Sequence, residues 1–97
     1  MIIIHVEHFL NKAGKKYFPI FIKEMRKAMI KYNKGFISLR QLEKEDATTE
    51  THFLLEYENI DLLQEFSKTE PHVKLIEEIK KHQVRKQTVE KFHPIEN

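Results

Sequence analysis

The sequence predicts an α+β domain in which helices cover one face of an antiparallel four-stranded sheet. Two observations support this prediction. First, the expected elements follow one another along the 97 residues as strand, helix, strand, strand, helix, strand. A helix that joins two strands supplies a crossover, which gives a βαββαβ sandwich of ferredoxin-like topology. Second, residues 36–43 and 51–58 are rich in β-branched and aromatic residues and are separated by a polar connection at 44–50. This is the pattern of two strands folded back on each other.

The first third of the chain is expected to form a strand and an amphipathic helix. In residues 1–10 alternate side chains point to opposite faces of the sheet. Residues 11–16 are expected to form a turn. From about Lys16 a helix follows, because apolar residues then recur at steps of three and four: Phe18, Phe21, Ile22, Met25, Ala28, Met29 and Tyr32. Gly35 suits a left-handed cap at the end of this helix.

The last third of the chain is expected to form a broken helix and a final strand. A short helix at 61–67 is followed by a second helix that begins at Pro71, a residue suited to the first helical position. We expect this helix to end between His82 and Arg85. A weak last strand at 87–92 and a short tail complete a single domain at 1–97, with its core at about 1–93.

The strands have apolar residues at both odd and even positions, so both faces of the sheet are partly apolar. Helices in a chain of this length cover only one face. A large contiguous apolar surface is unusual for a soluble monomer. We therefore expect a homodimer in which two sheets pack face to face.

Composition excludes several classes of protein. There is no cysteine, so no disulfide or thiolate chemistry is expected, and cytoplasmic residence is the default. No apolar run approaches the roughly 18 residues of a membrane span. A net charge of +2 provides no whole-chain field for nucleic acid. The six histidines lack the spacing of metal ligands, so no metal site is predicted.

The charge is unevenly distributed along the chain. Lysines crowd the first third, whereas acidic residues dominate the middle. Solvated helix and hairpin faces explain this pattern most simply. The alternative is a pair of complementary patches for self-association, or a positive rim that attracts an anionic ligand.

Three titratable residues are candidates for catalysis: Glu7, His5 and His72. His5 and Glu7 lie two residues apart on one strand, hence on the same face and roughly 7 Å apart. If that face lines an apolar pocket, Glu7 is suited to act as a general base. His72, near a helix start, is a candidate hydrogen-bonding partner. The expected pocket-lining residues are Phe9, Phe21, Met25, Phe66 and Ile76.

A structural interpretation of the same residues stays open. His5 and Glu7 could simply pair with a Lys or Arg of a neighbouring strand, such as Arg40. His72 could do no more than cap its helix. Perturbed or unusual titratable groups mark functional sites only in some cases.

A set of short motifs extends over nearly the whole chain. A Lys-x-Gly turn lies at 12–14, a Gly-Phe pair at 35–36 starts the second strand, and Tyr57 closes the third strand before a short helix. The segment 67–72 then restarts a helix with a small residue followed by Pro and His. In these motifs and their spacing the chain resembles the antibiotic biosynthesis monooxygenase (ABM) domain superfamily, whose members form dimeric α/β barrels.

The resemblance implies cofactor-independent oxygenation of a quinol- or anthrone-like small aromatic molecule. One branch of the superfamily degrades haem with an Asn on the first strand, a Trp on the short helix and a His on the next helix. The matching positions here carry Glu7, Phe66 and Ile76, so haem degradation is disfavoured and no cofactor is expected. Many other members carry a His at the position of Phe66, a second departure from the pattern. The alternative function is a non-catalytic dimeric module of the same fold that binds a small molecule or a partner.

Overall fold

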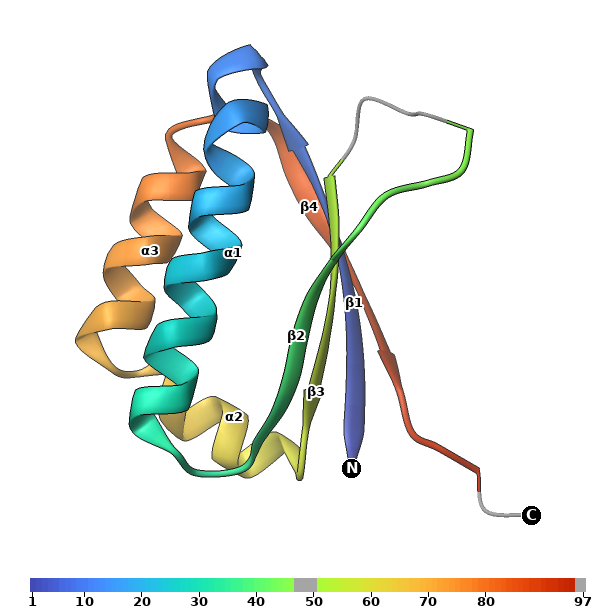
Figure 1. The fold of residues 1–97 in the computed structure, drawn as a ribbon, viewed down its shortest axis with the longest axis vertical. Helices are drawn as coiled ribbons and strands as arrows, with labels where there is room; N and C mark the ends of the chain where they lie inside the picture. Colours follow the sequence, from blue (N-terminus) through green and yellow to red (C-terminus); the bar gives the residue numbers. More distant parts are fainter. Residues whose placement is uncertain (47–50, 96–97) are drawn as a thin grey trace.

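The computed structural model describes residues 1–46 and 51–95, and these residues form four strands and three helices (Figure 1). The sheet is antiparallel throughout and has the strand order β2-β3-β1-β4. The predicted ferredoxin-like α+β fold is therefore confirmed, although part of the predicted polar connection at 44–50 lies outside the described residues. In chain order the elements are β1 (Ile2–Leu10), α1 (Lys12–Tyr32), β2 (Phe36–Leu42), β3 (Thr51–Tyr57), α2 (Ile60–Ser67), α3 (Glu70–Lys80) and β4 (Gln83–Phe92).

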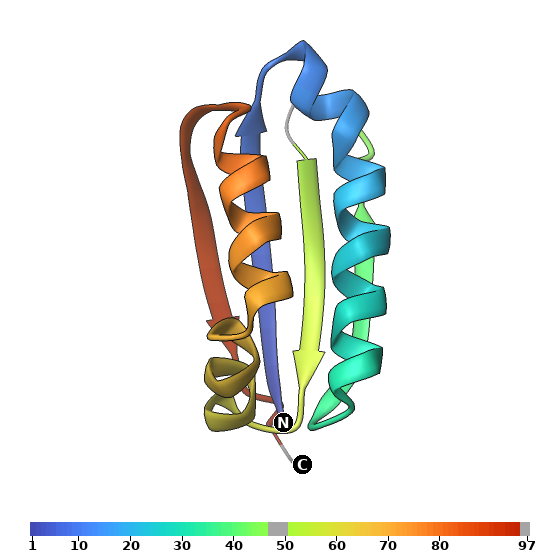
Figure 2. The ribbon, with the colours of Figure 1, turned by 90° about the vertical axis from the view of Figure 1, so that its left-hand side faces the viewer.

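The helices and the sheet form two layers. All three helices lie on one face of the sheet, and α1 and α3 run side by side across it (Figures 1 and 2). Even-numbered residues of β1, from Ile2 to Leu10, are buried on this face, whereas odd-numbered residues point to the other face. Ile4 pairs with Leu55 on β3, and Leu55 pairs with Leu39 on β2. One row of buried aliphatic side chains therefore crosses three strands beneath the helices.

Helix α1 begins at Lys12, so the turn predicted up to Lys16 is wrong. The cause is an N-terminal cap. Asn11 has an extended backbone, and its side-chain oxygen accepts a hydrogen bond from the N–H of Gly14 at 2.8 Å. Such a cap satisfies one of the N–H groups that have no partner within the helix, and so allows the helix to start earlier.

The end of α1 differs from the prediction in its capping residue. Asn33 occupies the cap position with a left-handed φ of 53°, and its N–H bonds to the carbonyl of Met29 at 3.1 Å. Gly35, the predicted cap, also has a positive φ of 81°, but it follows the cap. Two left-handed residues close together turn the chain sharply from α1 into β2.

Helix α3 ends at Lys80 and not between His82 and Arg85 as predicted. The N–H of His82 bonds back to the carbonyl of Ile79 at 3.0 Å, which closes the last turn. The carbonyl of His82 accepts a hydrogen bond from the N–H of Asn11 at 2.9 Å. This contact draws the chain to the end of β1, so β4 starts earlier than the sequence predicted.

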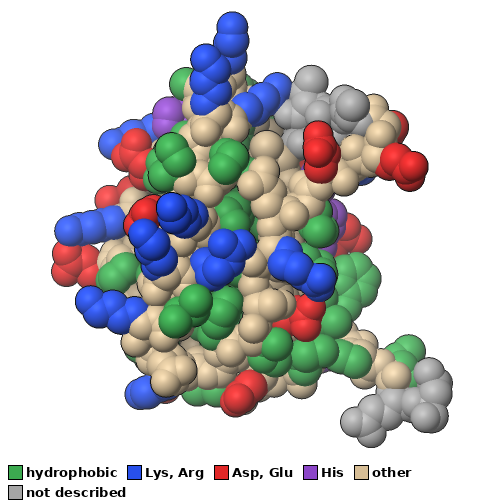
Figure 3. All heavy atoms as spheres, in the orientation of Figure 1, with side chains coloured by type: hydrophobic (Ala, Val, Ile, Leu, Met, Phe, Trp, Pro, Cys, Tyr) green, Lys and Arg blue, Asp and Glu red, His purple; other side chains and the backbone are tan. Residues whose placement is uncertain are grey.

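The face of the sheet opposite the helices, called here the open face, carries no helix of the described chain (Figure 1). Arg40 and Glu56 form an ion pair across β2 and β3 on this face, with 3.0 Å between Nη2 and Oε1. Hydrophobic side chains are visible on the right-hand side of Figure 3, the side to which the open face points. The open face is therefore partly apolar and partly charged. Its apolar side chains, placed by the strand register, are Ile3, Phe9, Leu42, Leu54 and Phe92.

The outer surface of the helices is polar and mostly basic (Figure 3). On α1 the lysines at positions 16, 23, 27 and 31 are exposed, and one of them, Lys27, pairs with Glu24 at 3.8 Å. This arrangement fits the interpretation of a solvated helix face. Within the described part of the chain, no helix combines the length and the apolar character needed to span a bilayer.

Candidate functional site

A cavity of about 290 Å³ lies between the helices and the sheet. This volume is near the lower end for small-molecule pockets, roughly 300 Å³. Most of its wall is apolar, because it is formed by the buried row of the sheet and by the inner faces of α1 and α3. Among the apolar lining residues are Ile4, Val6, Phe21, Met25, Leu55 and Ile76.

A few polar side chains interrupt this apolar wall. The only charged one among the described residues is Lys91, and no Asp or Glu of the described chain lines the cavity. Lys91, together with half-exposed Val89 on β4 and exposed Gln64 on α2, places the mouth between β4 and α2. The site is therefore a hydrophobic chamber with a cation near its entrance. Its polar lining residues are His8, Gln64, Ser67, His72, Gln87 and Lys91.

His72 lies in the first turn of α3 and lines the cavity. Its ring packs edge-on against Phe66, with the ring centroids 5.5 Å apart. Burial lowers the pKa of His72, and the nearby carbonyl of Ser67 opposes this effect only in part. The ring is therefore mostly neutral at physiological pH. Its buried Nδ1 atom has no hydrogen-bond partner among the described residues.

His8 is the second histidine of the cavity wall and is only 3% exposed. Its ring lies among the rings of Phe18, Phe21 and Phe53, with centroid separations of 5.7 to 6.0 Å. Burial lowers the pKa of His8 to about 4, because a charged imidazole is poorly solvated among aromatic rings. His8 is consequently neutral at physiological pH. The Nε2 atom of Gln83 lies 3.4 Å from its Nδ1.

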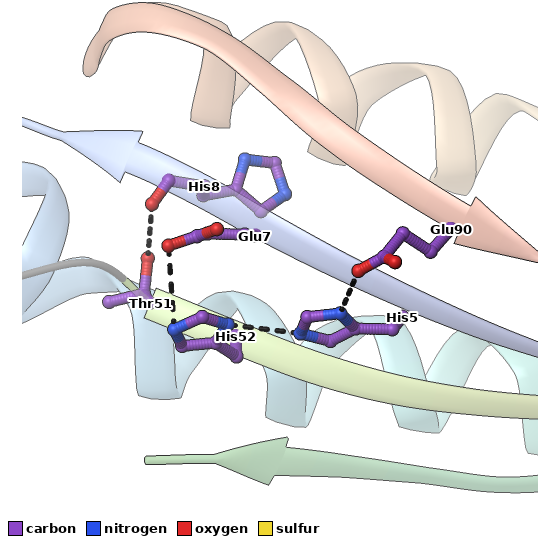
Figure 4. A network of polar contacts seen from close by, with 6 residues as sticks. All are labelled: His5, Glu7, His8, Thr51, His52 and Glu90. Atoms are coloured by element: carbon purple, nitrogen blue, oxygen red, sulfur yellow. Dashed lines mark hydrogen bonds and ion pairs between the residues drawn. The ribbon is translucent and has the colours of Figure 1, made fainter. Parts of the chain in front are cut away.

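His5 and Glu7, by contrast, lie on the open face. Their side chains are 24% and 20% exposed, and the strand β1 separates them from the cavity. Figure 4 shows His8 on the other side of β1 from His5. The condition set for Glu7, that its face of β1 lines an apolar pocket, is therefore not met, because the cavity lies on the opposite face of the sheet.

The open face instead joins four titratable side chains from three strands (Figure 4). Nδ1 of His5 contacts Oε1 of Glu90 at 3.2 Å, and Nε2 of His5 contacts Nδ1 of His52 at 3.0 Å. Nε2 of His52 lies 3.6 Å from Oε2 of Glu7. The alternative that His5 and Glu7 pair with a Lys or Arg of a neighbouring strand is wrong in its partners, because His5 contacts Glu90 and His52, Glu7 lies near His52, and Arg40 pairs with Glu56.

The predicted pocket-lining residues divide between three places. Phe21, Met25 and Ile76 line the cavity. Phe66 is buried in the core but is not a lining residue. Phe9 lies on the open face, where the guanidinium of Arg85 sits 3.8 Å from its ring centroid. Phe9 was misplaced because it belongs to the odd-numbered row of β1, which points away from the cavity.

Sequence reasoning missed His8, although a signal for it was present. His8 belongs to the even-numbered row of β1 with Ile2, Ile4 and Val6, and it is the one polar member of that row up to Leu10. A single polar residue in an otherwise aliphatic buried row is a better candidate for a cavity than two polar residues in a mixed row.

Comparison with solved structures gives consistent likenesses over the full chain. A candidate antibiotic biosynthesis monooxygenase from Nitrosomonas europaea superposes with a TM-score of 0.82 at 9% identity, covering 99% of this chain and 100% of the other. Another candidate from Deinococcus radiodurans superposes with a TM-score of 0.77 at 11% identity, covering 100% of this chain and 95% of the other. A third antibiotic biosynthesis monooxygenase structure gives 0.73 at 16% identity, with 99% and 100% coverage. This chain has the ABM fold.

The ABM fold is recognised here through structure alone. No protein-family model and no curated protein sequence matches the chain. At identities of 9% to 16% the likeness establishes the arrangement of strands and helices and not the chemistry. The resemblance of the sequence motifs to the ABM superfamily is thus confirmed at the level of fold.

Proposed function

We propose that this ABM-fold chain is a monooxygenase that oxygenates a quinol- or anthrone-like aromatic molecule without a metal or flavin. The observation that supports this proposal is an apolar cavity whose wall holds two neutral histidines, buried His8 and partly buried His72, and no acidic side chain of the described residues. Apolar walls suit an aromatic ring system. A neutral imidazole is suited to accept or donate a proton near neutral pH.

In the proposed reaction His72 acts as the general base. It removes a proton from an anthrone-like substrate, and the resulting electron-rich anion transfers electrons to O₂ as a carbon–oxygen bond forms. The hydroperoxide then loses water to leave a carbonyl group. Overall a CH₂ group and O₂ become a carbonyl group and water, so the substrate supplies all the electrons. His72 lines the cavity, and burial favours its neutral, proton-accepting form, which supports its assignment as the base.

We also propose that the chain is a homodimer in which two open faces pack together as a barrel. The apolar side chains of the open face, such as Phe92 at 49% exposure, need a cover that the described helices do not provide.

The experiment combines oxygen uptake with product analysis. The chain is incubated with 1,8-dihydroxyanthrone and with a panel of hydroquinones, and dissolved O₂ is followed against a protein-free control. We expect uptake of one O₂ for each anthraquinone formed, with no O₂ returned on addition of catalase. Release of O₂ by catalase would indicate simple autoxidation to hydrogen peroxide.

Two other outcomes would contradict the monooxygenase proposal. Absence of uptake across the panel, with a ligand that nevertheless raises the melting temperature, would favour the non-catalytic binding module. A tight complex with haem and a shifted Soret band would contradict the expectation that no cofactor is used, which rests on Ile76 at the position of the axial His.

A further inference from the structure

His8 has a defined hydrogen-bonding arrangement in the cavity wall. The amide nitrogen of Gln83 donates to Oε1 of Gln87 at 2.9 Å and lies 3.4 Å from Nδ1 of His8. An amide nitrogen only donates, so Nδ1 of His8 is the acceptor. A neutral imidazole that accepts at Nδ1 carries its hydrogen on Nε2. No described residue accepts a hydrogen bond from this Nε2, which leaves the N–H free for a molecule in the cavity.

The surroundings of His8 keep it in this neutral, donating form. The three phenylalanine rings around it exclude water, and no described carboxylate contacts it to stabilise a second proton. A fixed N–H in a water-poor site interacts strongly with an oxygen that carries negative charge, because little solvent screens it. His8 thus provides the kind of donor that stabilises an oxyanion.

The charge at the rest of the cavity wall also favours an anionic ligand. Lys91 brings a positive charge to the mouth, and it forms no ion pair with an acid of the described chain. Gln64 and Gln87 each carry an amide N–H donor and a carbonyl acceptor, and neither adds a charge. Without an acidic lining residue in the described part, the only formal charge at the cavity wall there is the cation of Lys91, and neutral N–H and O–H donors lie beside it. Such a set complements an anion.

We propose that the cavity binds a hydroxyaromatic ligand in its ionised form, with the Nε2–H of His8 as the donor to the ligand's oxygen. In this step the O–H bond of the ligand breaks and its proton passes to His72 or to water, so no oxidant or reductant takes part. The inference rests on the proposed function for its substrate class. It concerns the bound anion before any reaction with O₂, and so it has its own test.

The test uses 2-hydroxyanthraquinone as the probe. This molecule is already oxidised, so it is not consumed, and its colour changes on ionisation. Its absorbance is titrated against pH when free and when bound to the wild-type chain. We expect the bound probe to ionise at least about one pH unit below the free probe, a tenfold preference for the anion. His8→Phe keeps an aromatic ring among Phe18, Phe21 and Phe53 and is expected to abolish this shift.

Two further variants separate the donor from general effects. His8→Gln retains an N–H donor and is expected to keep part of the shift. His93→Phe changes an exposed histidine outside the cavity and is expected to leave the shift unchanged. Circular dichroism and the melting temperature of each variant establish that it is folded.

Several results would overturn the inference. The bound probe could ionise at or above the pH of the free probe, the His8→Phe variant could keep the full shift, or the folded chain could fail to bind the probe. The inference would also be overturned if nitrogen-15 NMR found the hydrogen of neutral His8 on Nδ1 and not on Nε2. Failure of the proposed oxygenation is recognised separately, because a chain that consumes no O₂ with 1,8-dihydroxyanthrone could still lower the pH at which the probe ionises.

Discussion

The Nε2 atom of His5 lies 3.0 Å from the Nδ1 atom of His52, and the two ring planes differ by 6°. The ring centroids are 5.2 Å apart, much farther than the two nitrogens, so the rings meet edge to edge and share one hydrogen. At the outer nitrogens, Nδ1 of His5 lies 3.2 Å from Oε1 of Glu90, and Nε2 of His52 lies 3.6 Å from Oε2 of Glu7.

The first prediction concerns the coupling within this network. We expect a double-mutant cycle of His5→Leu and His52→Leu to give a coupling energy of roughly 0.5–2 kcal/mol, because each substitution removes the partner of the other. Urea unfolding of the wild type, the two single variants and the double variant at pH 7 measures this coupling energy. The control cycle pairs His5→Leu with His93→Leu, whose side chain is exposed, and should be additive. Additivity in the His5–His52 cycle would show that the contact contributes nothing in solution.

The second prediction concerns stability in acid. The pKa of His8 is about 4 in the folded chain and near 6.5 when unfolded, so the unfolded chain binds this proton more readily. The stability that depends on neutral His8 is complete above pH 6.5 and is lost as the pH falls toward 4. We expect the protonation of His8 alone to lower the free energy of unfolding by about 2 kcal/mol between pH 7.5 and pH 5.

Urea unfolding at these two pH values tests this expectation with one variant and one control. His8→Phe should reduce the pH dependence by that amount, whereas His93→Phe should leave it unchanged. An unchanged pH dependence in His8→Phe would mean that His8 already titrates normally in the folded chain.

The third prediction concerns the close approach of α1 to the connection between α3 and β4. A Cβ atom at Gly14 would lie 2.5 Å from the Cβ of His82 and 3.0 Å from that of Leu10. We expect Gly14→Ala to destabilise the chain by about 1–3 kcal/mol through overpacking, despite the better helix propensity of Ala. Thermal unfolding measures it, with Lys16→Ala on the exposed side of α1 as the control. An equally or more stable Gly14→Ala variant would contradict the close contact.

The fourth prediction concerns the proposed dimer. Leu54 lies on the open face, and Ile20 lies on the outer side of α1 with 55% exposure. We expect Leu54→Lys to shift the chain from dimer to monomer in sedimentation experiments at micromolar concentration, because two unpaired charges would be buried at the two-fold interface. Ile20→Lys should leave the dimer intact. A wild-type chain that sediments as a monomer would refute the barrel.

The fold could be predicted from the sequence because its signals are local and redundant. The helical repeat from Phe18 to Tyr32 and the paired strand patterns each specify one element, and the order of the elements then limits the topology. Element ends were less predictable. The start of α1 depends on the side chain of Asn11, and the end of α3 depends on a hydrogen bond from Asn11 to His82, which lie far apart in the sequence.

The candidate site was only partly predictable because a strand has two faces. Both rows of β1 contain apolar residues, so the pattern alone did not decide which row faces the helices. His72 was found because it follows a recognisable helix restart. The row of β1 that holds His8 was visible in the sequence, but its contact with Gln83 was not, because Gln83 is distant in sequence and lies where the helix was expected to end.

We infer that chemistry takes place in the cavity beneath the helices and not on the open face. The most direct measurement compares initial rates of O₂ uptake with 1,8-dihydroxyanthrone for folded His72→Phe and Glu7→Gln variants. Loss of a general base costs about 100-fold or more. We expect that loss for His72→Phe and a rate within about twofold of wild type for Glu7→Gln. A normal rate in His72→Phe together with loss of activity in Glu7→Gln would contradict this inference.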